Sequence, residues 1–438
     1  MSRMPRLFFL LMLILLPNLA FAGPRIERVI SATGIEAWLV REPKIPMLSL
    51  QAMWRGGTAS DPLGQEGRAA LAADLLTEGA GDLDAESFQT ALRDGAIDLG
   101  FDAGRDYLSL SLRTLNDQRQ RAFELLAMAM TAPRFDDEPV ARVKAQAEAG
   151  ARRALNNPGS LVNRRFMATA FPGHAYGRDS SPTLESLPNL QRADFAAYAR
   201  AALARKNLVI GVVGDITPDE LRKLLDASFG KLPAESSLVQ PPLVVPKTAA
   251  KPIIVPYDNP QSIVIFGGPG LLRDDPDYYA ASVLNYVLGG GGFNSRLTEE
   301  IREKRGLVYS VGTQLHPMLS AGLFLGSLST RNDQAGQALG LVREAFARIA
   351  LEGITEQELN DAKAYLTGSF PLRLTSNGAI AGLLAAMRAS NLGPDYIDRY
   401  PEYIDAVRLE DVRRVAQRLL ASGNLLVVVV GKPVGIDG

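Results

Sequence analysis

The sequence contains no cysteine and only two histidines among its 438 residues. Without cysteine the chain has no disulfide, no thiolate metal ligand and no lipid attached through an N-terminal cysteine. A catalytic zinc ion needs three protein ligands and an open position for water. His174 and His316 are far apart in the sequence, in a predicted turn and a predicted loop. They cannot form a His-x-x-x-His zinc site on one helix face.

The sequence also lacks any strong excess of charge. The 47 Lys and Arg residues and the 48 Asp and Glu residues leave a formal net charge of −1 at pH 7. This balance gives no reason to expect attraction to nucleic acid or to an anionic membrane. The hydrophobic fraction of 47% indicates a well-packed globular protein. Since the chain is too long for one ordinary core, we expect at least two domains.

The longest apolar run lies near the beginning of the chain and is too short to span a bilayer. A basic start precedes the apolar residues 7–16, and residues 20–22 read Ala-Phe-Ala, the small-x-small pattern of a cleavage site. A spanning helix needs about 20 apolar residues, whereas this run stops at Pro17. Residues 1–22 are therefore predicted to be a cleaved signal peptide, which implies a periplasmic protein. A transmembrane anchor is the alternative.

Two pairs of segments repeat at nearly the same spacing, which indicates an internal duplication. Residues 48–57 and 262–268 each read as a strand followed by glycines, while residues 207–214 and 424–431 each read as Asn, an apolar strand and Gly. Helical patterns lie between these strands in each copy. We predict an α+β protein of two homologous domains, each a mostly antiparallel sheet with helices packed on one face.

The domain boundaries follow from the repeat and from a proline-rich segment. Residues 23–231 and 253–438 are predicted as the two domains, and residues 232–252, with five prolines, as the linker. The predicted helices that matter for the site cover residues 69–76 and 137–155 of the first domain and 355–370 of the second.

Residues 67–76 resemble the inverted zinc helix of the pitrilysin/insulinase family of peptidases. That helix reads Gly-x-Ala-His-x-x-Glu-His-Met-Leu, with two zinc-binding histidines and a glutamate as general base. Here Ala70 and Asp74 replace the histidines, Ala73 replaces the base, and Glu148 lies roughly where the third ligand falls. A pair of carboxylates without imidazole does not hold zinc. We therefore expect no metal and no cofactor in this chain.

Residues 288–311 resemble the motif of the family's second domain almost residue for residue. The resemblance implies that Arg302 and Tyr309 polarise the scissile carbonyl, since guanidinium and phenol groups stabilise a developing oxyanion. A charged helix face and a packed strand tyrosine are the structural alternatives. The resemblance also implies peptide contacts in a flexible glycine-rich loop, with a simple turn as the alternative. The residues of this loop are Gly289, Gly290, Gly291, Gly292, Phe293 and Asn294.

Together these features resemble the non-catalytic subunit of a heterodimeric bacterial peptidase, related to the subunits of the mitochondrial processing peptidase. The resemblance implies one half of a clam-shell around unfolded peptides or small proteins, with zinc in a homologous catalytic partner subunit. This chain would supply Arg302 and Tyr309 across from that zinc. The alternative is a metal-free peptide-binding or scaffold protein of the cell envelope without turnover. A pure scaffold has no need for the Arg/Tyr pair.

Overall fold

The structure is a computed structural model that describes residues 23–420 and 425–437. Within these residues helices make up 48% and strands 20%, which confirms the predicted α+β class. No helix in the described ranges is long and apolar enough to cross a membrane. The predicted signal peptide, residues 1–22, lies outside the described part of the chain.

The first sheet has six strands in the order β1-β2-β6-β3-β5-β4. All neighbouring strands are antiparallel except β2 and β6. Apolar residues alternate along β5, and Leu108, Leu110 and Leu112 point into the core. The strands are β1 (Ile26–Ile30), β2 (Glu36–Arg41), β3 (Met47–Arg55), β4 (Asp98–Ala103), β5 (Tyr107–Leu115) and β6 (Leu208–Gly214).

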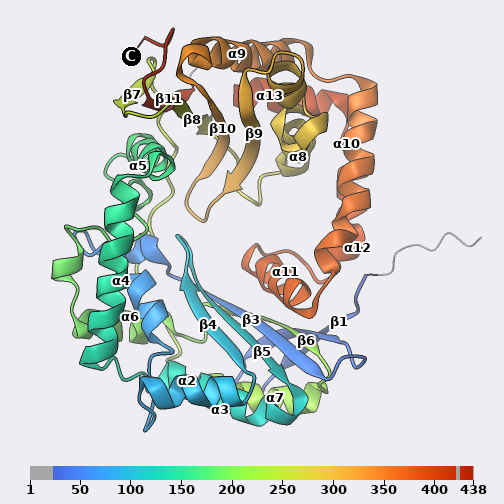
Figure 1. Ribbon diagram of the computed structural model, residues 1–438. Coiled ribbons are helices and arrows are strands. Elements are labelled where there is room, and N and C mark those ends of the chain that lie inside the picture. Colours follow the sequence, from blue (N-terminus) through green and yellow to red (C-terminus); the bar gives the residue numbers. More distant parts are fainter. Residues whose placement is uncertain (1–22, 421–424, 438) are drawn as a thin grey trace, which may run out of the picture.

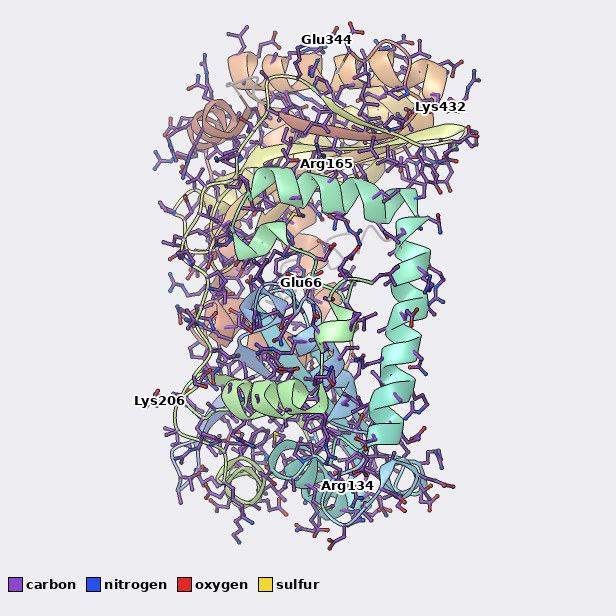
Figure 2. All side chains as sticks on the ribbon, turned by 90° about the vertical axis from the view of Figure 1, so that its left-hand side faces the viewer. Glu66, Arg134, Arg165, Lys206, Glu344 and Lys432 are labelled. Atoms are coloured by element: carbon purple, nitrogen blue, oxygen red, sulfur yellow. The ribbon has the colours of Figure 1, made fainter. Side chains whose placement is uncertain are left out.

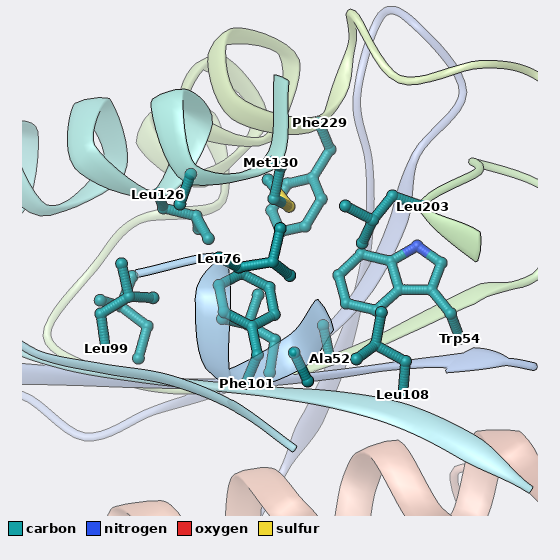
Figure 3. Packing of buried hydrophobic residues seen from close by; sticks show 14 of the residues in the cluster. Ala52, Trp54, Leu76, Leu99, Phe101, Leu108, Leu126, Met130, Leu203 and Phe229 are labelled. Atoms are coloured by element: carbon teal, nitrogen blue, oxygen red, sulfur yellow. The ribbon is translucent and has the colours of Figure 1, made fainter. Parts of the chain in front are cut away.

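Helices of the first half cover one face of this sheet (Figure 1). Figure 3 shows the core between them, where Trp54 and Phe101 of the sheet meet Leu76, Met130 and Phe229. Burial of such large apolar side chains is the main source of folding free energy. The covering helices are α1 (Arg68–Leu75), α2 (Ala85–Asp94), α3 (Arg119–Thr131), α6 (Arg192–Ala202) and α7 (Pro218–Phe229).

The second sheet repeats the topology of the first. Its order is β7-β11-β8-β10-β9, with β7 and β11 parallel and all other neighbours antiparallel. This is the order and orientation of β2-β6-β3-β5-β4, as an internal duplication requires. The strands are β7 (Ile253–Pro256), β8 (Gln261–Pro269), β9 (Val308–Pro317), β10 (Gly322–Arg331) and β11 (Leu426–Gly431).

The core of the second half lies between this sheet and several helices, three of which supply most of its helical residues. Phe266 of β8 and Phe324 of β10 both pack against Phe346 of α9. Their ring centroids lie 5.8 and 6.0 Å, respectively, from that of Phe346. Aromatic contacts of this geometry add to the free energy gained by burial alone. The three helices are α8 (Tyr278–Asn285), α9 (Ala335–Glu352) and α13 (Leu409–Leu420).

Each half also covers the opposite sheet face of the other half. Helix α5 (Pro158–Ala170), from the first half, packs on β11 and β8. Helix α11 (Asn377–Ala389), from the second half, packs on β6 and β3. A Cβ at Gly211 of β6 would collide with the carbonyl oxygen of Ala381, so glycine permits this close approach. The halves are therefore interlocked, which the predicted one-sided packing did not include.

Long helices complete the connection between the halves. Figure 1 shows α4 (Asp137–Leu155) on one side of the molecule and α10 (Glu356–Ser369) with α12 (Tyr396–Asp405) on the other. In Figure 2, α4 runs from the end of the first half near Arg134 to α5, which carries Arg165. The two sheets are thus held at opposite ends of the molecule.

A buried polar cluster also joins the halves. The hydroxyl of Tyr176 donates to Asp106 Oδ1 at 2.6 Å and accepts from the backbone N–H of Ser320 at 2.9 Å. The second oxygen of Asp106 accepts from the backbone N–H of Leu319 at 2.9 Å. Burial, followed by the hydrogen bond to Asp106, raises the pKa of Tyr176, so the phenol keeps its proton. One carboxylate and one phenol therefore bind the turn between β9 and β10 to the first half.

Candidate functional site

The helix that resembles a zinc helix is α1, and it carries no metal ligands. Ala73, at the position of the general base, is only 1% exposed and packs in the core, while Asp74 is exposed. Partial desolvation and the neighbouring carboxylates of Asp102 and Glu78 raise the pKa of Asp74. Within the described residues, no group of three or more His, Cys, Asp or Glu residues could hold a metal.

Glu148 does not complete a site with Asp74. Its carboxylate lies 2.6 Å from the guanidinium of Arg152, one turn further along α4, in an exposed ion pair. Such i,i+4 pairs belong to solvated helix faces. The spacing of Glu148 and Arg152 was visible in the sequence and is the signal that could have removed Glu148 from the candidate ligands.

A buried carboxylate holds the beginning of α1. Asp61 accepts hydrogen bonds from the backbone N–H groups of Gly67 at 2.9 Å and Ala69 at 3.0 Å, and it lies 3.6 Å from Arg68. These donors favour the ionised form, but burial outweighs them and raises the pKa of Asp61 to about 7. The site region of the first half thus retains a structured helix N-terminus, although the helix carries no catalytic group.

Both histidines occupy positions that belong to the fold: His174 is hydrogen-bonded within a turn, and His316 lies in a strand. His174 Nδ1 accepts from the backbone N–H of Tyr176, and Nε2 lies 3.0 Å from the carbonyl oxygen of Pro242. The first bond requires a lone pair on Nδ1, so Nε2 carries the proton and donates to Pro242. His316 lies within β9 opposite Leu323, and its predicted place in a loop is wrong because β9 extends to Pro317.

The second half brings three predicted site residues together. Arg302 is the penultimate residue of η7 (Thr298–Glu303), a π-helical turn, and Tyr309 is the second residue of β9. The Arg302 guanidinium lies 5.9 Å from the ring centroid of Tyr309 and 4.9 Å from that of Phe293. Its Nε also lies 3.7 Å from Glu303. Cation–π contacts at these distances hold the guanidinium between two rings.

The rings of this cluster face solvent. Tyr309 is 78% exposed and Phe293 is 66% exposed, unusual values for large aromatic side chains. A β-bulge contributes to the exposure of Tyr309: Ser310 pairs with Ser329 and Val308 with Thr330, which leaves Tyr309 without a partner on β10. We call Phe293, Arg302 and Tyr309 the aromatic–arginine cluster.

The glycine run before the cluster does not form one open loop. Gly289 is the fourth residue of η5 (Tyr286–Gly290), and Gly292 begins η6 (Gly292–Asn294). Gly289 is buried, and a Cβ there would lie 2.7 Å from the backbone nitrogen of Thr313 in β9. Gly289 is therefore shielded from solvent in this structure, and its predicted peptide contact stays a prediction. Of the remaining loop residues Gly291 is half-buried, while Gly290, Gly292, Phe293 and Asn294 are exposed.

A bidentate ion pair fixes the segment that carries Arg302. Arg296 Nε and Nη2 lie 2.6 and 2.7 Å from the two carboxylate oxygens of Glu358. Glu358 also accepts from the backbone N–H of Thr355, the residue that caps α10. Burial alone would raise the pKa of Glu358, but the hydrogen bonds from Arg296 and Thr355, together with the Arg296 charge, outweigh it and lower the pKa. Planar two-point contacts of this kind orient as well as attract.

Comparison with known proteins identifies the family to which this fold belongs. The family described as "Peptidase M16 inactive domain" matches residues 189–366. A crystal structure of a peptidase M16 inactive domain from Pseudomonas fluorescens is 31% identical, with a TM-score of 0.86 over 94% of this chain and 99% of that one. The chain belongs to the peptidase M16 family.

Relatives within the M16 family carry both inactive and peptidase names. The "non-peptidase homolog YmxG" of Helicobacter pylori is 28% identical over 75% of this chain and 76% of its own. An "uncharacterized zinc protease" of Streptomyces coelicolor is 27% identical over 74% and 72% of the two chains. A structure described as a protease from Helicobacter pylori shares the fold at 19% identity, with a TM-score of 0.84. These findings support a non-catalytic member of the M16 family.

Proposed function

We propose that this chain is the non-catalytic, substrate-binding subunit of a periplasmic heterodimeric zinc metallopeptidase. The observation that carries the proposal is the aromatic–arginine cluster: an ordered guanidinium held between two exposed rings, in a chain whose described residues contain no metal site. A scaffold gains nothing from large aromatic side chains in water, whereas a peptide-binding surface does.

In this proposal the two subunits divide the chemistry. A homologous partner with an intact His-x-x-Glu-His helix supplies the zinc ion and the general base. This chain supplies Arg302 and Tyr309, which donate hydrogen bonds to the carbonyl oxygen as negative charge develops on it. The substrates are unfolded peptides or small proteins, since an extended chain presents its backbone to both subunits.

The second candidate is a metal-free peptide-binding or scaffold protein of the cell envelope without turnover. The same cluster supports it in part, because Phe293 and Tyr309 can bind apolar side chains of a peptide whether or not zinc lies opposite. The two candidates differ in one respect. Only the first requires the Arg302 and Tyr309 donors to change the rate of cleavage.

The test is purification of the chain with its native partners, followed by zinc analysis and a peptide-cleavage assay. We expect a zinc-bearing homologue in equal amount and cleavage only by the pair. Tyr309→Phe and Arg302→Gln should each lower kcat by about 100-fold, as the loss of one oxyanion donor does. Tyr257→Phe, at a half-buried position outside the cluster, and Arg165→Gln, at an exposed position on α5, are the matched controls. Full activity of both site variants would refute the proposed role, and a metal-free homodimer without cleavage would favour the second candidate.

A further inference from the structure

A cavity of about 480 Å³ in the second half is lined by several tyrosines and two arginines. Its lining comes from strand β9 and from the helical segments α8, η5, α10, η9, α11 and α12. Of these, α10, α11 and α12 lie on the right in Figure 1. Its walls hold five tyrosines and two arginines but no aspartate or glutamate. The chain as a whole has nearly equal numbers of acidic and basic residues, but the charged residues of this cavity wall are all basic. The tyrosines are Tyr278, Tyr286, Tyr365, Tyr396 and Tyr400.

The first of these arginines is held by aromatic rings rather than by a carboxylate. The Arg273 guanidinium lies 4.1 Å from the ring centroid of Tyr278, and its Nη2 donates to the hydroxyl of Tyr396 at 3.0 Å. Across residues 23–420 and 425–437, no carboxylate lies within ion-pair distance of it. The nearby carboxylates of Asp275 and Asp277 are instead engaged by Arg418 and Arg414, at 2.8 and 2.6 Å. Arg273 is thus ordered while its charge stays unneutralised.

The second arginine, Arg373, lies on η9 (Phe370–Leu374) at the cavity wall. Its guanidinium lies 5.7 Å from the ring centroid of Phe370, and no ion pair neutralises it within the described residues. Two guanidinium groups without acids in one cavity make a site for an anion, because guanidinium binds carboxylate in a planar fork. Tyrosine rings beside them favour an anion with an apolar or aromatic body.

We propose that this cavity binds the C-terminal carboxylate of a peptide whose last side chain is apolar or aromatic. Gln314 and Leu315 of β9 line the same cavity, and β9 leads from there to Tyr309 of the aromatic–arginine cluster. Leu315 lies six positions beyond Tyr309, which corresponds to about 20 Å of extended strand at about 3.3 Å per residue. A peptide held by its C-terminus reaches the cluster with about six residues. This inference rests on the proposed function for the identity of its ligand as a peptide.

The test measures binding by the full chain alone, so that it does not depend on cleavage. An unstructured, fluorescently labelled peptide ending in phenylalanine is compared with the same peptide amidated at its C-terminus. We expect the free acid to bind at least 10-fold more tightly. Arg273→Gln and Arg373→Gln should each abolish the preference, and Arg165→Gln on α5 (Figure 2) should keep it. Arg373 is exposed, so its variant remains informative if Arg273→Gln fails to fold.

Three outcomes overturn the inference: equal binding of acid and amide, a preference that survives both arginine substitutions, or competition by inorganic phosphate as strong as by acetyl-phenylalanine. The last outcome would make the cavity a general anion site. If the chain prefers the free acid but no reconstituted pair cleaves peptides, the carboxylate site stands and the proposed peptidase function is refuted. If cleavage depends on Arg302 but the chain binds acid and amide equally, the proposed function stands and the carboxylate site is refuted.

Discussion

Replacement of Tyr176 by phenylalanine tests how strongly the buried polar cluster joins the two halves. Tyr176 is 0% exposed, so its hydroxyl has no access to water when its partners are lost. The substitution removes one hydrogen bond to the Asp106 carboxylate, which contributes about 1.5–3 kcal/mol. It also leaves the buried N–H of Ser320 without its acceptor, at a cost of about 1–3 kcal/mol. The ring itself is kept, so packing changes little.

We therefore expect Tyr176→Phe to lower the free energy of unfolding by about 4 kcal/mol, the middle of the summed range. Denaturant unfolding measures this loss of stability. Amide hydrogen exchange shows where the structure is weakened, since protection should fall first at Leu319 and Ser320. Tyr257→Phe is the matched control, because the Tyr257 hydroxyl also bridges the halves: it donates to the carbonyl oxygen of Asn156 at 2.9 Å, in a hydrogen bond that is exposed to solvent. It should cost less than about 1 kcal/mol. Equal losses in the two variants would refute the reasoning.

Three further substitutions test other parts of the structure. Because burial raises the pKa of Asp61 from 3.8 to about 7, the native state binds more protons than the unfolded state between these two pH values. The stability contributed by this group should therefore fall as pH rises from about 4 to 7, and Asp61→Asn should remove that slope from denaturant midpoints; an unchanged slope contradicts the assignment. Ala73→Glu should lower the free energy of unfolding by about 3–5 kcal/mol in thermal or denaturant melts, since it buries an unpaired carboxylate. Ala70→Glu, at a half-buried position, should cost much less, and similar losses would show that α1 does not face the core as described. Arg296→Lys should cost about 1 kcal/mol and increase hydrogen exchange in residues 298–303, because lysine cannot keep both contacts to Glu358. The exposed pair of Arg331 and Asp333 provides the control, and equal effects of Arg331→Lys would argue against an ordering role.

Local patterns in the sequence were enough to find the strands and helices that frame the site. The apolar runs at residues 48–54 and 208–214 lie in β3 and β6, and the amphipathic pattern at residues 137–155 coincides with α4. These elements were visible because each buries a continuous apolar face. The replacements at Ala70 and Ala73 were equally visible, since a missing donor atom needs no structure to detect.

Contacts between segments far apart in the sequence could not be predicted from such local patterns. Nothing local to α5 or α11 says that each covers the sheet of the other half, because the pattern shows an apolar face but not its partner. The solvent exposure of Tyr309 depends on a bulge against β10, and the burial of Gly289 depends on contact with Thr313. The cavity around Arg273 gathers residues from six helical segments and one strand. The one local signal was the four-residue spacing of Tyr396 and Tyr400, which places the two tyrosines on the same helix face.

The interlocked packing of α5 and α11 has a consequence for the order in which the protein takes shape. The last strand of the first sheet, β6, ends at Gly214, but the helix that closes the second face of this sheet begins at Asn377. About 160 residues separate these points. Until the chain has been delivered as far as α11, from the ribosome or across a membrane, the first half presents an uncovered apolar sheet face. A molecule that assembles in this way needs protection from premature association until its C-terminal third has emerged.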